Sequence, residues 1–304
     1  MLINNINLKP IFRLSSIFIF FILIFCSCKK DESSQSTVPL NDLTEQYIIE
    51  NDSIVQFMKS HFYNYQDFEN ITSYDSHNII FDSIVGDNID KTPIFDQVST
   101  IQIGIKDEND QIVNHNLYYH IIRNGKGENP SVADSVFVSY QGLLFDGKSF
   151  DSRENPIWME GKNLIRGFQE FLPLLKKGDV TINNNGTYNF FDFGIGFVIF
   201  PSGLGYFQNG SISIPPYSPL IFKVDMMTFS RTDHDNDTVL TIDEDIDGDH
   251  NFNNDDTDSD NIPNYVDNDD DNDGVLTRNE YDTNNDGIPD DSDGDGIPDY
   301  LDSN

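Results

Sequence analysis

The chain has 304 residues, of which 52 are acidic and 18 are basic, so its formal net charge is −34 at pH 7. A charge of this size and sign argues against binding to nucleic acid, whose phosphates attract basic surfaces. Residues 232–304 hold 26 of the acidic residues and one basic residue, Arg278. The sequence therefore divides into a strongly acidic C-terminal segment and a remainder that must fold by ordinary apolar burial.

The N-terminus predicts export. Lys9 and Arg13 precede an apolar run over 14–25, which as a helix spans about 18 Å and is too short for a bilayer core of about 30 Å. A basic start and a short apolar run are typical of a secretory signal, here 1–27. A disulfide between Cys26 and Cys28 would close a strained ring, so we expect no disulfide framework.

The end of this run, Phe25-Cys26-Ser27-Cys28, resembles a bacterial lipoprotein signal. In such signals the cysteine after the cleavage point carries the lipid, and Cys28 fits because the small residue Ser27 precedes it. The following Lys29-Lys30-Asp31-Glu32 looks like the surface-export signals of Bacteroidetes lipoproteins. The resemblance implies a lipid on Cys28, a Ser-rich tether over 28–39 and a cell-envelope location as an outer-membrane lipoprotein, facing either the periplasm or the outside.

Residues 40–116 predict an N-terminal extension that is partly helical. Between 42 and 62 the apolar residues recur at spacings of three, four and seven, which predicts one or two amphipathic helices, broken at Asn51-Asp52-Ser53. Short β-rich pieces, one of them over 100–105, alternate with polar turns up to residue 111. This segment contains no catalytic constellation of residues.

Residues 117–231 predict an α+β domain. Alternating apolar runs separated by glycine-containing turns indicate an antiparallel sheet, with a final strand over 220–229. One helix is expected from Ile165 or Gly167 to Lys176, with Gly178 as its C-cap. The segment is rich in aromatic residues, which form either a core or a pocket, and periodicity does not separate the two.

The order of motifs in this segment resembles the FKBP-type peptidyl-prolyl cis-trans isomerases. That resemblance covers about 110 residues and implies a five-stranded antiparallel sheet wrapped on one helix, with isomerase activity and no cofactor for catalysis. The motifs are Val138-Ser139-Tyr140-Gln141-Gly142, Asp146-Gly147-Lys148-Ser149-Phe150-Asp151-Ser152, Leu164-Ile165-Arg166-Gly167-Phe168, Ile199-Phe200-Pro201-Ser202-Gly203-Leu204-Gly205-Tyr206, Ile214-Pro215-Pro216 and Leu220-Ile221-Phe222-Lys223-Val224.

Carried over residue by residue, the resemblance implies a proline-binding pocket. Ile157 or Trp158 adds a wall, because a one-residue deletion leaves that register open. Phe168 replaces the usual tryptophan floor, and Phe207 stands where glycine is usual. An insertion over 182–193 extends a hairpin beside the pocket, where it either contacts substrate or only covers a strand. The other pocket residues are Tyr140, Phe150, Asp151, Leu164, Ile165, Tyr206, Ile214 and Phe222.

The acidic segment predicts calcium loops. In 269–280, aspartates stand at loop positions 1, 3 and 5, Gly274 at 6, Val275 at 7, Thr277 at 9 and Glu280 at 12, which is the spacing of a calcium loop. The same phase recurs five more times. The predicted ligands are Asp233, Asp235, Asp237, Thr241, Glu244, Asp245, Asp247, Asp249, Asp256, Asp258, Asp260, Asp269, Asp271, Asp273, Val275 (through its carbonyl), Thr277, Glu280, Asp282, Asn284, Asp286, Asp291, Asp293 and Asp295.

A solvated acidic tail is the alternative, but such a tail has no reason to keep glycine or asparagine at position 6 and an apolar residue at position 7. Ile-Pro dipeptides at positions 7 and 8 of three loops argue against helices that leave those loops, because proline disfavours a helical residue before it. Residues 232–304 resemble thrombospondin type 3 calcium repeats, which implies structural calcium. Because this segment shares no motif with 117–231, we expect it to be an independent structural element.

Taken together, the sequence predicts an exported, lipid-anchored prolyl isomerase whose partners are proline-containing polypeptides and whose membrane contact is the lipid alone. Two other functions stay open. One is a non-catalytic module that binds or chaperones proline-containing segments in the same pocket. The other is a calcium-stabilised surface spacer or adhesion protein in which the isomerase-like domain is a passenger.

Overall fold

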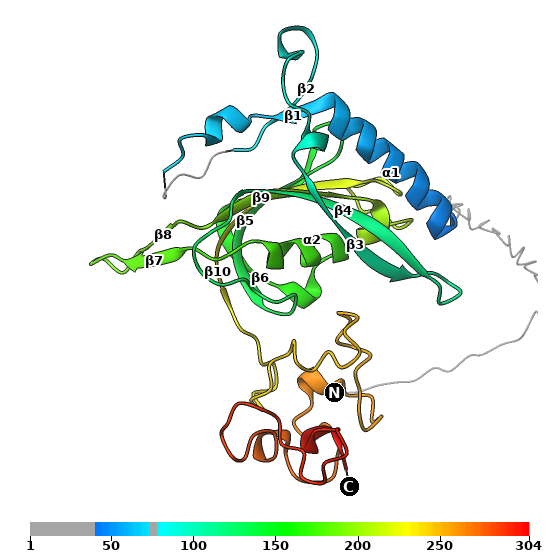
Figure 1. The fold of residues 1–304 in the computed structure, drawn as a ribbon, viewed down its shortest axis with the longest axis vertical. Helices are drawn as coiled ribbons and strands as arrows, with labels where there is room; N and C mark the ends of the chain where they lie inside the picture. The colour runs from blue at the N-terminus through cyan, green and yellow to red at the C-terminus, as the bar shows by residue number, and fades with distance from the viewer. Residues whose placement is uncertain (1–39, 73–77, 304) are drawn as a thin grey trace, which may run out of the picture. The chain divides into compact units, whose positions relative to one another are not determined.

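The computed structural model describes residues 40–72 and 78–303, so the signal segment and Cys28 lie outside the described residues. Its centre is an antiparallel sheet in the order β3-β4-β9-β10-β5-β6 (Figure 1). Within the described ranges, no helix is both long enough and apolar enough to cross a membrane. The strands of this sheet are β3 (Ser99–Lys106), β4 (Ile112–Arg123), β5 (Ser135–Leu143), β6 (Ser149–Glu160), β9 (Gly194–Phe200) and β10 (Leu220–Ser230).

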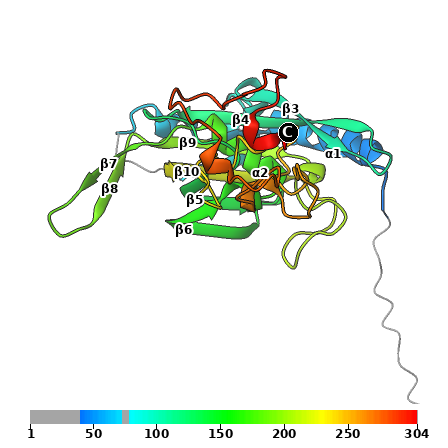
Figure 2. The same cartoon turned by 90° about the horizontal axis from the view of Figure 1, so that it is seen from below.

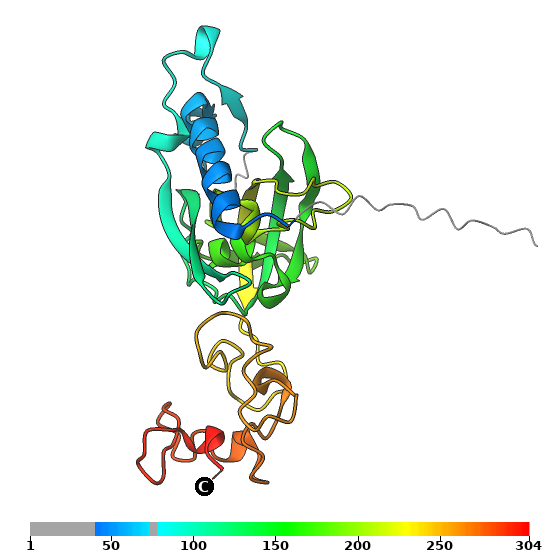
Figure 3. The same ribbon diagram turned by 90° about the vertical axis from the view of Figure 1, so that its right-hand side faces the viewer.

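Two helices cover opposite faces of this sheet (Figures 1 and 3). Helix α1 (Leu43–Ser60) packs on Ile195, Phe197 and Ile199 of β9. Helix α2 (Arg166–Phe171) packs on Val198 and Phe200 of the same strand. Successive side chains of a strand point to opposite faces, so β9 contributes alternately to two apolar cores.

The sheet has six strands, one more than the five predicted. The N-terminal extension supplies the additional strand, β3, which pairs with β4 from Ser99↔Tyr119 to Lys106↔Ile112. The predicted boundary between residues 116 and 117 therefore falls inside β4. The second difference from the expected sheet on one helix is α1, because the N-terminal extension covers the face that α2 leaves free.

Helix α1 is continuous, so the predicted break at 51–53 is wrong. Asp42 caps its N-terminus by accepting a hydrogen bond from the backbone N of Glu45 at 2.9 Å. Inside the helix, Ser53 Oγ bonds back to the Ile49 carbonyl at 3.0 Å, and Asn51 Oδ1 accepts a hydrogen bond from Tyr118 of β4 at 2.8 Å. Contacts with the sheet thus hold polar residues in helical conformation despite their weak propensity.

Helix α2 is shorter than predicted. It ends at Phe171 and continues as one 3₁₀ turn, Leu172–Leu174, because Pro173 lacks the N–H that another α-helical turn requires. Gly178 is therefore not its C-cap. A Cβ at Gly178 would lie 2.4 Å from the carbonyl oxygen of Phe191, so this glycine permits a close approach between two backbone segments.

The predicted hairpin insertion forms a separate two-stranded sheet, β7 (Asp179–Ile182) with β8 (Tyr188–Phe191), which extends away from the main sheet (Figure 2). Its Phe190 packs against Phe137 on the α1 face, with ring centroids 5.5 Å apart. A second short pair, β1 (His61–Tyr63) with β2 (Phe81–Ser83), follows α1. Neither hairpin lies on the face that α2 covers.

A buried carboxylate joins α1 to the loop that follows β9. Glu50 is 3 % exposed and accepts hydrogen bonds from the backbone N and the Oγ of Ser202, each at 2.6 Å. Gln46 Nε2 donates a third bond at 2.6 Å. Burial raises the pKa of Glu50 and these donors oppose the shift. The N-terminal extension is thereby tied to the segment that leads to Tyr206.

We expect Glu50→Ala to lower the free energy of unfolding by about 2–3 kcal/mol, because it leaves the buried N–H and hydroxyl of Ser202 without an acceptor. Urea unfolding followed by fluorescence measures the change. Glu45→Ala is the matched control, since Glu45 is exposed on the same helix, and its cost is expected to stay below about 0.5 kcal/mol. Equal effects of the two substitutions would contradict a stabilising role for this contact.

Candidate functional site

A cavity of about 380 Å³ opens between α2, β5, β6 and β10, within the usual range for small-ligand sites. Nine of the ten predicted pocket residues line it, so the motifs that are separated in sequence converge in space. Met159, Asn163 and Ser211 line it as well. The predicted residues in the lining are Tyr140, Phe150, Asp151, Leu164, Ile165, Phe168, Tyr206, Ile214 and Phe222.

Aromatic rings form the floor and walls of the cavity. Phe168 and Phe222 are stacked, with centroids 4.5 Å apart and an interplanar angle of 11°. Tyr140 lies 5.7 Å from Phe168, and Phe150 meets Phe222 edge-on at 5.4 Å. Helix α2 approaches β9 closely because residue 167 is glycine, where a Cβ would lie 2.5 Å from the ring of Phe200. This close packing fixes the position of Phe168.

Polar groups stand at the rim. Asp151 accepts hydrogen bonds from Tyr140 Oη at 2.6 Å, from the backbone N of Ser152 at 2.8 Å and from Arg153 at 3.1 Å. The hydroxyl of Tyr206 has no hydrogen-bond partner among the described residues and can donate to a ligand. Burial, followed by the Asp151 hydrogen bond, raises the pKa of Tyr140 to about 12, and burial also raises the pKa of Tyr206. Neither tyrosine ionises near neutral pH.

Trp158 is the predicted pocket residue that the structure places elsewhere. It is 54 % exposed and packs against Phe137, at 5.2 Å, on the face opposite the cavity. Its neighbours Ile157 and Met159 point to the cavity side and pack on that core, and Met159 lines the cavity. Successive side chains of β6 point to opposite faces, so Trp158 faces away from the cavity while Ile157 and Met159 share the face toward it.

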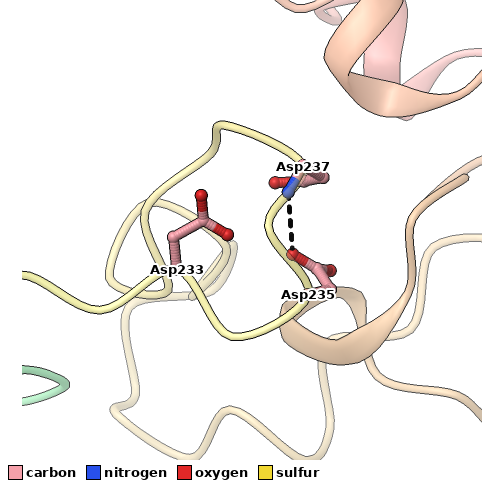
Figure 4. Close-up of side chains that lie close together, drawn as sticks. All are labelled: Asp233, Asp235 and Asp237. Carbon is pink, nitrogen blue, oxygen red and sulfur yellow. Dashed lines mark hydrogen bonds between the residues drawn. The ribbon is translucent and has the colours of Figure 1, made fainter.

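The six loops of the acidic segment share one backbone conformation. Position 6 has a positive φ in all six, at Thr238, His250, Asn261, Gly274, Gly287 and Gly296. Position 4 does too, at Asn236, Gly248, Ser259, Asn272, Asn285 and Gly294. In the first loop the backbone N of Asp237 donates to Asp235 Oδ1 at 3.3 Å, and Asp233 faces them from the start of the loop (Figure 4). Thr238 and His250 therefore adopt the turn that glycine adopts elsewhere.

Carboxylates gather inside these loops. Groups whose oxygens lie within 4.8 Å of one another include Asp233/Asp235/Asp237, Asp245/Asp247/Asp255, Asp256/Asp258/Asp260 and Asp269/Asp271/Asp273. Several of their buried oxygens have no hydrogen-bond partner among the described residues, among them Oδ2 of Asp235, Oδ2 of Asp258, Oδ2 of Asp271 and Oε1 of Glu280. Oxygen ligands in this arrangement fit calcium, which takes six to eight of them.

The pKa values report the same crowding. Burial, with the neighbouring carboxylates Asp271 and Asp273, raises the pKa of Glu280 to about 7. Burial also raises the pKa of Asp235 and of Asp237, which lie beside each other. Carboxyls placed this way resist ionisation unless a cation lies among them.

Some of the predicted calcium ligands make other contacts in the structure. The hydroxyl of Thr241 bonds to His234 Nδ1 at 2.7 Å, and Thr277 Oγ1 accepts from the backbone N of Asp270 at 3.1 Å, so both brace their loops. Asp255 completes the group of Asp245 and Asp247, while Asp249 lies 3.6 Å from Lys106. Asp255 was not among the predicted ligands because it stands at loop position 11, one residue before the position at which the calcium-loop spacing places its last ligand.

The acidic segment contacts the domain that carries the cavity, so the expected independence is wrong. The Asp249 carbonyl accepts a hydrogen bond from Arg166 of α2 at 2.7 Å, and His250 Nδ1 lies 2.6 Å from Glu170 of the same helix. Phe252 is 3 % exposed and packs on Val132 and Ala133. At the exit of β10, Thr232 Oγ1 donates a hydrogen bond to the carbonyl of Ala133 at 3.0 Å. A shared apolar cluster and several polar bonds join the two.

Curated relatives match about 115 residues of the chain. It is 34 % identical over 114 residues to the FKBP-type peptidyl-prolyl cis-trans isomerase FkpA of Escherichia coli, covering 36 % of this chain and 37 % of that protein. It is 39 % identical over 115 residues to a probable FKBP-type isomerase of Haemophilus influenzae, covering 36 % and 42 %. The peptidyl-prolyl cis-trans isomerase Mip of Coxiella burnetii is 30 % identical over 119 residues, covering 38 % and 45 %. The chain thus spans less than half the length of each.

A crystal structure of FkpA from Escherichia coli aligns with 42 % of this chain and 51 % of its own at 30 % identity and a TM-score of 0.32. In the acidic segment, residues 234–288 match a family model described as BamM C-terminal. The curated names agree with the motif order and with the pocket residues that converge in the cavity. The central domain of this chain is homologous to the FKBP-type peptidyl-prolyl cis-trans isomerases.

Proposed function

We propose that the chain is an exported peptidyl-prolyl cis-trans isomerase that acts on proline-containing polypeptides. The observation that carries this proposal is the convergence of nine predicted residues in one aromatic cavity. Homology over the central domain supports it, because the matching relatives are named for this activity.

The chemistry suits such a cavity. Resonance keeps an X-Pro amide planar, and rotation about it meets a barrier of about 20 kcal/mol. Rotation breaks no bond and needs no nucleophile or proton donor. The stacked rings of Phe168 and Phe222 would hold the proline ring away from water, where the twisted and less strongly solvated amide is favoured.

Two rim groups would orient the substrate. Asp151 is already fixed by three donors, so little reorganisation accompanies binding. The free hydroxyl of Tyr206 would donate a hydrogen bond to a substrate carbonyl. Because neither tyrosine of the cavity titrates near neutral pH, the reaction needs no change in their protonation.

For the acidic segment we propose a structural role for calcium. Six loops with one backbone conformation, and buried carboxylate oxygens without partners, support this role. Without cations the 26 acidic residues of 232–304 repel one another, and the segment has few large apolar side chains to oppose that repulsion. Bound calcium would replace the missing core.

For location we propose the cell envelope, with a lipid on Cys28 as the membrane attachment. The basic start, the short apolar run and the Ser27-Cys28 pair support this location. The Ser-rich stretch up to residue 39 would then separate the lipid from α1.

Activity is tested in the cavity. Tyr206→Phe, Asp151→Asn and Phe222→Leu should each lower kcat/KM at least about tenfold, or ~1.4 kcal/mol, in a protease-coupled assay on Xaa-Pro-Phe peptides. Trp158→Ala is the aromatic control and should keep wild-type activity, because Trp158 lies on the opposite face. A wild-type chain that leaves the peptides at their uncatalysed rate would favour the non-catalytic binding module.

Attachment is tested at the two cysteines. Cys28→Ser should move the protein from the membrane fraction to the soluble fraction, because it removes the residue that would carry the lipid. The isomerase activity should stay unchanged, because Cys28 is not a cavity residue. Fractionation of cells that express each variant, followed by immunoblotting, measures the effect. Release by Cys26→Ser instead would assign the lipid to the other cysteine.

Calcium is tested by proteolysis. The protease Glu-C, which needs no metal, should cut after Glu244 in chelator and not in millimolar calcium, because Glu244 is 1 % exposed in the folded loop. Binding in the range of about 10⁻⁴–10⁻³ M is expected for extracellular loops of this kind. Identical cleavage patterns with and without calcium would show that the segment does not depend on the ion.

A further inference from the structure

Asp270 departs from a pattern that three of the other loops follow. It stands at position 2 of its loop, where those three place a hydroxyl, at Thr257, Thr283 and Ser292, that bonds to their own position 9. Ser292 Oγ donates to Asp299 at 2.6 Å, and Thr257 Oγ1 accepts from Asn264 at 2.9 Å. In Asp270 only the backbone N makes the corresponding contact, to Thr277. Its carboxylate therefore has no role within its own loop.

That carboxylate lies beside a different loop. Oxygens of Asp270, Asp237 and Glu244 are within 4.8 Å of one another, and each of the three side chains is 1 % exposed. Both oxygens of Asp270, both of Glu244 and Oδ2 of Asp237 lack a hydrogen-bond partner in the described part of the chain. Next to this group, Asn268 Nδ2 donates to the Asp235 carbonyl at 3.2 Å, so the two loops are in direct contact.

Among the described residues, no basic side chain neutralises the carboxylates of Asp237, Glu244 and Asp270. No lysine or arginine there forms an ion pair with any of the three carboxylates. Three desolvated carboxylates without a counter-charge are strongly unfavourable, and a cation among them removes that cost. The donors are all carboxylate oxygens, which are ligands suited to hard divalent ions such as calcium.

We propose that Asp270 is a ligand of the calcium ion that Asp237 and Glu244 bind. The ion then joins loop 233–244 to loop 269–280, so that the first loop is completed by a residue from outside it. The inference rests on the calcium role proposed above. It adds a ligand that the twelve-residue spacing does not contain.

The test uses the chain from Leu40 to Asn304, which contains all described residues. Glu-C cleavage at increasing calcium concentrations measures the protection of each loop separately. Cleavage after Glu244 reports on the first loop, and cleavage after Glu280 reports on the second. In Asp270→Asn, the calcium concentration that protects the Glu244 bond should rise at least tenfold, with a smaller shift at Glu280. Asp243→Asn is the matched control, since it removes the same charge from an exposed residue next to Glu244.

A double-mutant cycle tests whether the two carboxylates share one ion. By calorimetry with calcium alone, Glu244→Gln combined with Asp270→Asn should cost less than the sum of the single effects. Additive effects, equal shifts at both cleavage sites, or an Asp270→Asn variant that matches Asp243→Asn would each overturn the shared site. A wild-type chain that binds no calcium would instead overturn the calcium role itself.

Discussion

The alternation of side chains along the two central strands is the constraint on which the rest of the structure depends. Every residue of β9 is buried, and β10 is buried over most of its length, so each strand must supply a core on both faces. On one face Phe222 and Val198 meet α2 and form the cavity side. On the other, Phe197 and Ile221 meet α1. The core beneath α1 therefore supports, from behind, the strands that carry the aromatic rings of the cavity.

The acidic segment obeys a different constraint. Its residues carry too much like charge and too little apolar surface to fold by burial alone, yet the structure gives all six loops the same turns. It is also anchored, since Phe252 enters an apolar cluster of the central domain and α2 bonds to the second loop. The floor of the cavity and the second acidic loop therefore lie on two sides of one short helix.

Nine of the ten residues named from the motifs line one cavity, because the order of motifs along the chain carries three-dimensional information that periodicity lacks. The prediction failed at Trp158, because Ile157 and Met159 take the cavity side of β6 and alternation places Trp158 on the other face, against Phe137. Local propensity failed at Asn51, whose helical conformation depends on a bond from Tyr118. The role of Asp270 was equally hidden, because loop spacing describes ligands within a loop and cannot identify one that arrives from another.

Strand β3 has a consequence for how this domain can be isolated. The domain predicted from the sequence motifs, 117–231, begins within β4, and a fragment cut there would lack β3. The outer hydrogen-bonding groups of β4 would then form an exposed sheet edge, which invites pairing with other chains and aggregation. In the intact chain the outermost strands are β3 and β6, and β6 carries Arg153, Glu154 and Pro156, residues that discourage such pairing. The N-terminal extension thus covers the edge of β4 that such a fragment would expose.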